Sequence, residues 1–454
     1  MARPLRVAVV GSGPSGMYAA DALVSQQDVP VTVDVIDKLP VPFGLVRYGV
    51  APDHISIRSV RDTLDKVLEK PGVRFIGNLE VGVDISVATL HEYFDAIVFT
   101  YGASRDRRLS IPGEDLDASV AATDLVAWYC GHPDADRDTF ERIIPTATCV
   151  VVVGVGNVAV DVTRVLAKTV DELTHTDMPE YVFDTLRKSV ITDIHVLGRR
   201  GPAQATYTTK ELRELGELID ADIVVDPAEL VFDAASEQVI ADDKAVARNV
   251  EVVKAWAAKP QIGKSRRIHL HFMARPVELR GDNRVREVVV ERTELDGSGG
   301  AKGTGETFVI AADLVVRSVG YRGLALPGVP FDEDRSVIPH VDGRVQCDGA
   351  AVSGEYVAGW IKRGPTGIIG TNKKDAAATV ASLLADCDKL PVAPMSSPSD
   401  FDAWLTESGK QVVDNLGWRA IDSAERALGA GKDRDRTTIQ NTEDLLKAAK
   451  LTQA

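Results

Sequence analysis

A glycine-rich turn near the start of the chain has the spacing that binds the pyrophosphate of a dinucleotide. It reads Gly11-Ser-Gly-Pro-Ser-Gly16 and stands between the apolar run 5–10 and a helical pattern. In such a turn Gly11 permits the bend, Gly13 lets the backbone approach the phosphates, and Gly16 allows close packing of helix on strand. The N-terminus of the helix then supplies N–H donors to the phosphate oxygens.

An acidic residue follows at the place where a dinucleotide-binding unit uses one. Asp37 comes directly after the second apolar run, 31–36, and lies 21 residues beyond Gly16. A carboxylate at this place accepts hydrogen bonds from ribose hydroxyls. The alternative is a glycine turn with an unrelated surface aspartate, but strand, turn, helix and acid together favour a dinucleotide site.

A second turn of the same kind begins at Gly154. The sequence Gly154-Val-Gly-Asn-Val-Ala159 follows the buried-type run 148–153. Gly154 and Gly156 are expected to act as Gly11 and Gly13 do in the first turn, while Ala159 replaces the third glycine and still permits helix–strand packing.

Two arginines stand where the second unit would need its acid. The apolar run 193–197 is followed by Gly198-Arg-Arg-Gly201, which contains Arg199 and Arg200. Guanidinium groups suit a 2′-phosphate and cannot accept from a 2′-hydroxyl, so the pair predicts NADP(H) rather than NAD(H). Arg199 lies 40 residues after Ala159, about twice the usual offset. An insertion near 170–190 must therefore leave the core as a helix and loop. The alternative is a solvated pair at a strand end.

Two dinucleotide units in one chain predict two nucleotides, and FAD with NADPH is the pair that joins hydride chemistry to single-electron chemistry. The four cysteines, Cys130, Cys149, Cys347 and Cys387, are far apart and form no CxxC pair. A redox dithiol, a zinc ribbon and a sequence-encoded iron–sulfur cluster therefore lack their usual signature. Electrons are expected to leave to a separate acceptor, and the widely spaced thiols favour a reducing, cytoplasmic location.

Composition argues against two broad classes of function. The 454 residues include 52 Lys and Arg against 67 Asp and Glu, which gives a formal net charge of −15. Without a basic surplus, no nucleic-acid partner is expected. No run of about 18 uncharged apolar residues occurs, so no membrane insertion is expected either. The length predicts two or three domains.

The order of apolar runs predicts the architecture. Strand-like runs alternate with helical patterns from residue 5 to 100 and again from 148 to 197, which is typical of parallel sheets in α/β units. Between about 222 and 316, the runs 268–273, 285–292 and 307–316 resemble a β-meander. The C-terminal part is predicted as a linker at 388–400, an amphipathic helical tail at 401–428 and a solvated turn at 432–436.

Four longer motifs resemble one known family. They are Pro42-Phe-Gly-Leu-Val-Arg-Tyr-Gly-Val-Ala-Pro-Asp-His54, Ile111-Pro-Gly-Glu114, Gly198-Arg-Arg-Gly-Pro202 and Gly359-Trp-Ile-Lys-Arg-Gly-Pro-Thr-Gly-Ile-Ile-Gly-Thr-Asn372. The chain resembles adrenodoxin-reductase-type NADPH–ferredoxin reductases over nearly its whole length, and is particularly similar to actinobacterial members. The resemblance implies two Rossmann-like dinucleotide-binding domains. An FAD domain would comprise residues 1–107 and 323–454, with an NADP domain, 108–322, inserted between its parts.

The same resemblance implies which residues contact each cofactor. For FAD these are the first glycine turn with Ser15, Asp37, Leu45, Val81, Trp360, Gly367, Ile368 and Ile369. For NADP(H) these are the second glycine turn with Asn157, Val158, Arg107, Arg199, Arg200 and Glu211. Relatives often have Glu where this chain has Asp37, so its ribose contact is expected to be shorter or water-bridged. For Trp360 the alternative is a plain core residue.

His54 and Glu214 match a pair that lies near the flavin and nicotinamide at the catalytic site of relatives. Hydride transfer needs no obligatory proton donor, so we expect the pair to tune proton balance and nicotinamide orientation. Without the family, His54 is interpreted as a structural helix-cap residue and Glu214 as an ordinary exposed helical charge.

The activity that the resemblance implies is hydride transfer from NADPH to FAD, followed by single-electron transfer to a ferredoxin-type iron–sulfur protein. We expect a monomer that docks an acidic ferredoxin through a local basic patch. Two sequence clusters are candidates for it: Lys362, Arg363, Lys373 and Lys374, or Lys264, Arg266 and Arg267.

Two other functions are compatible with the same cofactors. One is an NADPH diaphorase or quinone reductase, which needs only an accessible flavin. The other is an electron-input flavoprotein subunit of a larger complex, like the small subunit of glutamate synthase, although this sequence lacks the cysteine-rich region usual in that family.

Overall fold

The chain forms two structural units, which a computed structural model describes for residues 3–450. One unit contains the residues up to Arg105 together with those from Tyr321 onward, and the other contains Asp106–Gly320. The short strands β5 (Arg105–Asp106) and β15 (Tyr321–Arg322) lie at the two crossings. The borders expected from the sequence lie after residues 107 and 322, whereas the units change after 105 and 320.

The first unit is built on a seven-stranded sheet. Its strands are β1 (Leu5–Val10), β2 (Val31–Ile36), β3 (Val73–Ile76), β4 (Ala96–Phe99), β16 (His340–Val341), β17 (Arg344–Cys347) and β18 (Ala350–Val357). The order is β16-β17-β18-β4-β1-β2-β3. The five strands β18, β4, β1, β2 and β3 are parallel to one another, and β17 and β16 continue the sheet at one edge through antiparallel pairs. Because the chain order reverses at β1, the carboxyl ends of β1 and β4 form the crevice where such sheets bind ligands.

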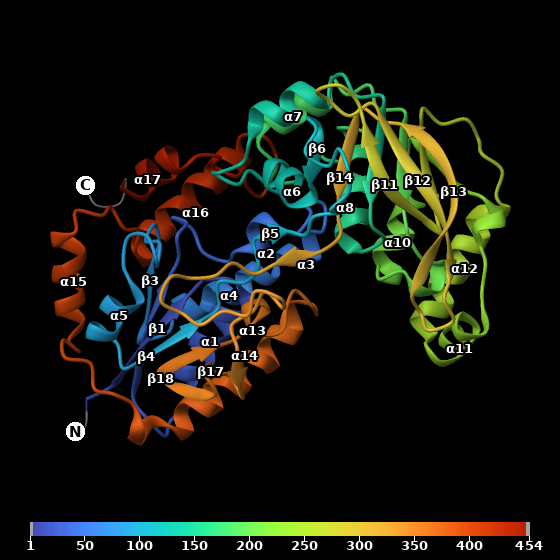
Figure 1. The fold of residues 1–454 in the computed structure, drawn as a ribbon. Coiled ribbons are helices and arrows are strands. Elements are labelled where there is room, and N and C mark those ends of the chain that lie inside the picture. The colour runs from blue at the N-terminus through green and yellow to red at the C-terminus, as the bar shows by residue number, and fades with distance from the viewer. Residues whose placement is uncertain (1–2, 451–454) are drawn as a thin grey trace. The chain divides into compact units, whose positions relative to one another are not determined.

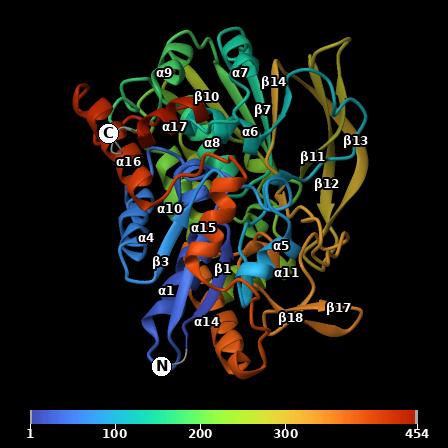
Figure 2. The same cartoon turned by 90° about the vertical axis from the view of Figure 1, so that its left-hand side faces the viewer.

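Two helices of the first unit pack against each other and against its sheet, namely α1 (Pro14–Ser25) and α14 (Ile369–Ala385) (Figure 2). Pro14 suits the first position of α1 because no N–H is needed there. The remaining helices are α2 (Leu45–Tyr48), α3 (Ile55–Arg58), α4 (Val60–Leu68), α5 (Val87–Tyr93), α13 (Trp360–Arg363), η3 (Cys387–Lys389), α15 (Pro398–Glu407), α16 (Asn415–Ala430) and α17 (Thr442–Lys450).

The C-terminal part confirms one sequence prediction and corrects another. The amphipathic helical tail expected at 401–428 is formed by α15 and α16, and Asp414 caps α16 by accepting from the Gly417 N–H at 2.8 Å. The expected solvated turn at 432–436 is wrong for Arg436, which is 1% exposed. Its guanidinium is drawn inward by acidic side chains of α16, described below.

The second unit is built on a six-stranded parallel sheet. Its strands are β6 (Ser119–Ala121), β7 (Cys149–Val153), β8 (Asp193–Leu197), β9 (Ala221–Val225), β10 (Arg266–His271) and β14 (Leu314–Arg317), in the order β6-β14-β7-β8-β10-β9. Its helices are α6 (Ala122–Cys130), α7 (Arg137–Ile143), α8 (Asn157–Ala167), α9 (Glu180–Leu186), η1 (Pro202–Gln204), α10 (Thr209–Leu215), η2 (Pro227–Glu229), α11 (Ala234–Asp242) and α12 (Lys244–Ala258). Helix α9 is the helix expected within the insertion at 170–190.

A smaller antiparallel sheet follows in the second unit, formed by β11 (Ala274–Arg280), β12 (Glu287–Leu295) and β13 (Ala301–Ala311) (Figure 1). The expected meander is therefore correct for the later runs and wrong for 268–273. That run forms most of β10, a parallel strand that pairs Ile268 with Ile194 of β8. The error has a physical cause: only one face of β10 is fully buried, so its alternating pattern is that of an antiparallel strand.

The two large sheets, one mostly and one entirely parallel, confirm the expected α/β class. Their central strands β1 and β7 are almost entirely buried, as continuous apolar runs in parallel sheets usually are. Among the described residues, no helix is both long and apolar enough to cross a bilayer.

Candidate functional site

The first glycine turn connects the end of β1 to the start of α1. Gly11 has φ +105°, and a Cβ there would lie 2.7 Å from Cα of Tyr101, so only glycine fits. A Cβ on Gly16 would collide with the carbonyl oxygen of Gly11. Gly13 differs, because nothing lies within 4 Å of the place its Cβ would take. The open space is thus at the glycine that has to approach a phosphate.

Asp37, at the end of β2, faces this turn. Its Oδ2 accepts from the Ser12 N–H at 2.8 Å and from the Ser12 hydroxyl at 2.5 Å, and its Oδ1 accepts from the Leu39 N–H at 2.9 Å. Burial raises the pKa of Asp37, although these hydrogen bonds oppose the rise. Each carboxylate oxygen has two lone pairs. The contacts therefore orient Asp37 and leave it able to accept from a ribose hydroxyl.

The segment 42–48 folds back onto the same turn. The Phe43 N–H donates to the Ser12 carbonyl at 3.1 Å, and Phe43 has φ +84°, which is uncommon for a residue with a side chain. Such strained backbone is often found at ligand sites. Leu45, the first residue of α2, is 38% exposed, whereas Val81 is buried and forms a β-bridge with Ile85.

The motif from 359 to 372 meets α1 at Ser15. Gly359 has φ +82° and lies so close that a Cβ on it would collide with Oγ of Ser15. The Ser15 hydroxyl donates to Oδ1 of Asn372 at 2.9 Å. Ser15 therefore joins the first glycine turn to a motif more than 340 positions later in the chain.

Trp360 and the start of α14 complete the expected flavin side. The Trp360 ring lies 5.5 Å from the Tyr321 ring, centroid to centroid, and its indole Nε1 is buried with no hydrogen-bond acceptor among the described residues. An unpaired buried donor is unfavourable, so this N–H fits an acceptor on a ligand. Gly367 has φ +84°, and Ile368, just before Ile369 begins α14, is 70% exposed.

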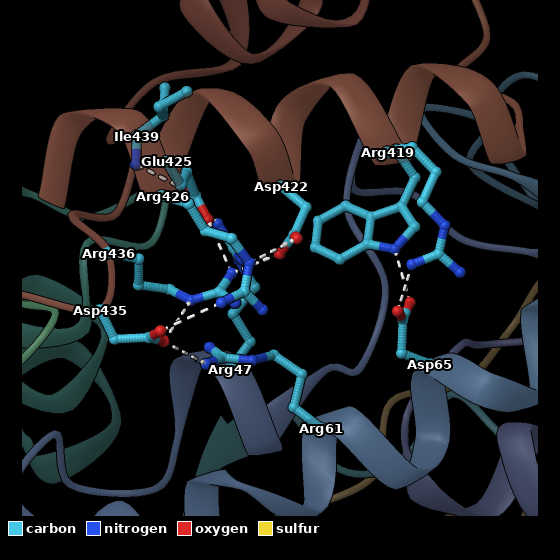
Figure 3. Close-up of polar contacts among 11 residues, drawn as sticks. Arg47, Arg61, Asp65, Arg419, Asp422, Glu425, Arg426, Asp435, Arg436 and Ile439 are labelled. Atoms are coloured by element: carbon cyan, nitrogen blue, oxygen red, sulfur yellow. Dashed lines mark hydrogen bonds and ion pairs between the residues drawn. The ribbon is translucent and has the colours of Figure 1, made fainter. Parts of the chain in front are cut away.

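Arg47 of α2 anchors the same segment to α16. It is fully buried and pairs with Glu425, which is also fully buried (Figure 3). Burial alone would lower the pKa of Arg47, but the Glu425 carboxylate raises it above its ordinary value. Arg436 lies 3.5 Å from the second carboxylate oxygen of Glu425 and donates to Oδ1 of Asp422 at 2.6 Å. Side chains of alternating charge thus connect α2 to α16.

The second glycine turn connects β7 to α8. Gly154 has φ +127°, and a Cβ on it would collide with the Ser318 carbonyl. Gly156 is nearly open, with only the Thr206 hydroxyl 3.3 Å from its would-be Cβ. Ala159 is completely buried, so a methyl group fits at the third position. In the same turn, Oδ1 of Asn157 accepts from the Thr208 N–H at 2.8 Å, and Val158 is partly exposed.

Arg199 and Arg200 follow β8. Arg199 has an exposed side chain. Arg200 is partly buried and donates to the carbonyls of Gly299 at 3.1 Å and Gln204 at 3.3 Å. Burial and the neighbouring charge of Arg199 lower the pKa of Arg200. A bound dianion would relieve this repulsion.

The remaining predicted contacts of the second unit lie on α10 and near residue 106, where the chain enters this unit. Arg107 is exposed, and its N–H donates to the Gly320 carbonyl at 2.8 Å. Glu211 is buried. Glu214 lies 3.5 Å from Nη1 of Arg164 and lines an open hollow with Lys210, Arg213 and Arg248.

His54 is buried in the first unit, directly before α3. It occupies the N-cap position of that helix, as the helix-cap interpretation expected, but its side chain makes no capping hydrogen bond to it. Glu214 belongs to the second unit, so the pairing of these two residues around the cofactors stays a prediction.

Comparison with known proteins decides the family. Residues 5–195 match pyridine nucleotide-disulphide oxidoreductases. NADPH-ferredoxin reductase FprA of Mycobacterium tuberculosis is 42% identical over 464 residues, covering 98% of this chain and 99% of FprA. The mitochondrial NADPH:adrenodoxin oxidoreductase of Arabidopsis thaliana is 36% identical, covering 98% of this chain and 96% of its own. The chain belongs to the adrenodoxin-reductase-type NADPH–ferredoxin reductases. The structure of M. tuberculosis FprA in complex with NADPH matches with a TM-score of 0.90 at 41% identity, over 98% of this chain and 100% of that one.

The residues of this reductase fit the two nucleotides of its family. Gly13 and Gly156 are open at the N-termini of α1 and α8, where a pyrophosphate finds N–H donors. The buried Nε1 of Trp360 has no acceptor among the described residues, which fits a flavin nearby. Arg199 and Arg200, which follow β8 and repel each other, would be stabilised by the 2′-phosphate of NADP(H).

Three cations of the two basic clusters considered for the reductase's partner are paired with carboxylates, namely Lys362, Arg363 and Arg267. Lys362 is buried and pairs with Asp375 at 2.9 Å, and Arg363 pairs with the same carboxylate at 3.0 Å. In the other cluster, Arg267 pairs with Asp193 at 2.6 Å, and the Lys264 ammonium donates to a backbone carbonyl. Lys373 and Lys374 are exposed.

Several residues that shape the site of this reductase were missed by sequence reasoning. Asn372 holds Ser15, Glu425 holds Arg47, and the Gly299 carbonyl holds Arg200. Asn372 is the last residue of the motif 359–372, so the sequence did contain a signal for it. No sequence signal pointed to Glu425 or Gly299, because the residues that they contact are far away in the chain.

Proposed function

We propose that this chain oxidises NADPH at its second unit and reduces a ferredoxin-type iron–sulfur protein through FAD held at its first unit. One contrast carries the proposal. The two glycine turns are alike, but different residues follow the neighbouring strands: Asp37 follows β2, and Arg199 and Arg200 follow β8. The carboxylate suits a ribose hydroxyl, and the guanidinium pair suits a 2′-phosphate.

When bound, FAD accepts a hydride and releases electrons one at a time. The open backbone at Gly13 receives its pyrophosphate, and Asp37 accepts from its ribose. The Trp360 indole N–H, which has no acceptor among the described residues, would donate a hydrogen bond to the cofactor. The N-terminus of α14, after Gly367, would stabilise negative charge at the edge of the flavin ring. Exposed Leu45 and Ile368 offer apolar surface to the cofactor.

The second unit binds NADPH by the same kind of backbone. Gly156 and the N-terminus of α8 receive the pyrophosphate, with Arg107 as a second cationic contact. Arg199 and Arg200 bind the 2′-phosphate, and Arg200 is already oriented by two backbone carbonyls. Asn157 orients the turn through its hydrogen bond to the Thr208 N–H, and Glu211 contacts the coenzyme from α10.

His54 and Glu214 act on the reacting end of the coenzyme. Their role is to orient the nicotinamide and to balance the proton that follows electron release. Neither is required for the hydride to move, so single substitutions are expected to slow turnover without abolishing it.

The partner is an acidic ferredoxin, and it is met by Lys373 and Lys374, two exposed cations of α14 that directly follow the motif 359–372. We further propose that the reductase acts as a monomer in the cytoplasm. Its four free cysteines, Cys130, Cys149, Cys347 and Cys387, are typical of a reducing compartment.

Anaerobic stopped-flow absorbance tests the proposal. The purified yellow protein is mixed with NADPH, then NADH, and the reduced protein is then mixed with ferredoxins of the same organism. We expect fast bleaching with NADPH only, followed by reoxidation by one ferredoxin that slows as salt screens the docking charges. Bleaching without reoxidation by any ferredoxin, but with fast quinone turnover, would identify a diaphorase instead. Replacing Lys373 and Lys374 by alanine should slow reoxidation and leave bleaching unchanged.

A further inference from the structure

A tight turn joins the last two strands of the antiparallel sheet, and one of its carbonyls contacts Arg200. The turn is Asp296-Gly-Ser-Gly-Gly300, between β12 and β13. The Gly299 carbonyl accepts from Nη1 of Arg200 at 3.1 Å, and the Gln204 carbonyl accepts from Nη2 at 3.3 Å. A guanidinium has five N–H donors. Two of them therefore hold Arg200 in place, which leaves three from which the oxygens of a phosphate can accept.

The side chain of Asp296 determines the shape of this turn. Its Oδ1 accepts from the Ser298 N–H at 2.9 Å, from the Ser298 hydroxyl at 2.7 Å and from the Gly300 N–H at 3.0 Å. The Asp296 N–H also donates to the Gly300 carbonyl at 3.1 Å. Gly299 has φ +86°, a conformation that glycine adopts without strain. Because Gly299 lies between the two residues that the carboxylate binds, Asp296 fixes the direction of the Gly299 carbonyl.

A second residue of the same sheet holds the backbone of the arginine pair. Thr293 of β12 is 6% exposed, and its hydroxyl donates to the Arg199 carbonyl at 2.8 Å. Its N–H donates to the Met273 carbonyl at 2.8 Å, and the Met273 N–H donates to the Arg200 carbonyl at 3.2 Å. The pairing of β12 with β13 shifts register between Glu291 and Thr293, and such irregularities re-aim side chains. Thr293 is thus connected to the backbone of both arginines.

We propose that Asp296 and Thr293 are positioning residues that make the reductase select dinucleotides with a 2′-phosphate, given the contact proposed above between that phosphate and the two arginines. A long side chain loses rotamer freedom when it is fixed on a ligand, and a side chain that is already fixed loses less. Asp296 acts on Arg200 through the Gly299 carbonyl. Thr293 acts on Arg199 through the carbonyl of Arg199 itself.

The turn also keeps two like charges next to each other before the coenzyme arrives. Burial, and then the charge of Arg199, lowers the pKa of Arg200, so both disfavour a guanidinium in this place. The charge-assisted hydrogen bond to the Gly299 carbonyl offsets part of that cost. When the turn is not held in shape, Arg200 is expected to move away from Arg199 into solvent. The 2′-phosphate then meets one guanidinium in place of two.

Calorimetric titration of the holoenzyme with 2′,5′-ADP and with 5′-AMP tests the proposal, because the two probes differ only by the 2′-phosphate. Asp296→Ala and Thr293→Val should each weaken 2′,5′-ADP binding roughly fivefold, the factor that about one neutral hydrogen bond contributes. Binding of 5′-AMP should stay as in the wild type. Asp296→Asn and Thr293→Ser should restore the affinity for 2′,5′-ADP, because an amide carbonyl and a serine hydroxyl can make the same hydrogen bonds.

The same sheet offers a matched control for each variant. Asp282→Ala removes an exposed acid from the turn between β11 and β12. Thr304→Val removes a hydroxyl that donates to the Arg292 carbonyl at 3.0 Å, away from the arginine pair. Both controls should bind 2′,5′-ADP like the wild type. Because Asp296 is exposed, its two variants decide the test even if buried Thr293 does not tolerate valine.

Combination with Arg200→Ala separates the positioning role from the phosphate contact itself. Arg200→Ala alone should weaken 2′,5′-ADP binding roughly tenfold or more. Asp296→Ala should add nothing in that background, because it acts through Arg200. Wild-type affinity in Arg200→Ala would refute the proposed phosphate contact, and the positioning role with it. A loss in Arg200→Ala, with wild-type affinity in Asp296→Ala and Thr293→Val, would refute the positioning role alone. Equal losses for 5′-AMP and 2′,5′-ADP would also refute it.

Discussion

Arg47 and Glu425 form an ion pair in which neither side chain is exposed by more than 1%. Arg47 belongs to α2, which follows the strained Phe43 beside the first glycine turn, and Glu425 belongs to α16 near the end of the chain. Arg436 and Asp422 extend the pair into a network (Figure 3). The position of the segment 42–48 therefore depends on α16, which lies more than 360 residues later in the chain.

Replacing Glu425 by glutamine should destabilise the first unit and loosen its flavin. Removal of one partner of a buried ion pair costs about 3–5 kcal/mol, because the other charge stays buried and uncompensated. Urea unfolding and the rate of FAD release on dilution measure both effects. Glu443→Gln is the control, since Glu443 is 79% exposed in its pair with Lys447. Wild-type flavin release in the Glu425 variant would show that α16 does not control the loop.

The Asp422 carboxylate should make stability depend on pH in the acid range. Burial raises the pKa of Asp422, but Arg426 and Arg436 outweigh burial and hold it below the ordinary value of 3.8. A depressed carboxyl pKa contributes stability that is present above about pH 4 and is lost as pH falls through the folded-state pKa. Asp422→Asn should therefore be less stable at pH 7 and show a shallower loss below pH 4. Urea midpoints from pH 7 to 3 check this, with exposed Asp28→Asn as a control that leaves the slope unchanged.

The two glycines Gly13 and Gly16 should respond to alanine in opposite ways. At Gly13 the backbone is extended with φ −66° and the new methyl group meets open space, so the apoprotein should keep its stability. The methyl group then occupies the room of the phosphates, and FAD binding should weaken roughly tenfold or more. At Gly16 the methyl group collides with the Gly11 carbonyl, so the apoprotein itself should be destabilised. The flavin-to-protein ratio and apoprotein unfolding separate the two; full flavin affinity in Gly13→Ala would contradict the assignment.

The pair Arg199 and Arg200 should determine coenzyme choice. Replacing both by alanine removes charge-assisted hydrogen bonds to the 2′-phosphate, each worth about 1.5–3 kcal/mol. The Michaelis constant for NADPH should rise roughly 100-fold or more, and that for NADH should change little. Steady-state kinetics with both coenzymes measure this, with Arg187→Ala as a control on the same unit. Equal rises for both coenzymes would refute the 2′-phosphate contact.

Local patterns predicted the parts of the site that lie within one strand–turn–helix unit. The positions of Gly11, Gly13 and Asp37, and of Gly154 and Arg199 beyond an insertion, follow from the spacing of strand ends. The structure adds why Gly11 and Gly154 must be glycines, which depends on Tyr101 and Ser318, residues that follow the ends of β4 and β14. Such contacts arise only once the sheet order is known.

Charged residues were the least predictable from sequence. Arg436 was expected in solvent because its neighbours are charged, yet Asp422 and Glu425 on α16 draw it inward. Lys362 and Arg363 were considered as docking residues for the ferredoxin, but both pair with the carboxylate of Asp375 on α14. In the same way, the alternation that made 268–273 look antiparallel comes from His269 and His271, which face a neighbouring histidine rather than open solvent. In each case the partner lies on another element, and no local pattern reports it.

The parallel pairing of β4 with β18 has a consequence for synthesis on the ribosome. Tyr356 of β18 pairs with Val98 of β4, and the whole second unit is encoded between them. The second unit is thus complete in the nascent chain while β4 still presents an unpaired edge, a surface that promotes aggregation. Glu425 is synthesised later still, so the Arg47 guanidinium lacks its counter-charge until α16 has been made. We expect a chaperone that shields strand edges to raise the yield of flavin-loaded protein when the gene is expressed quickly.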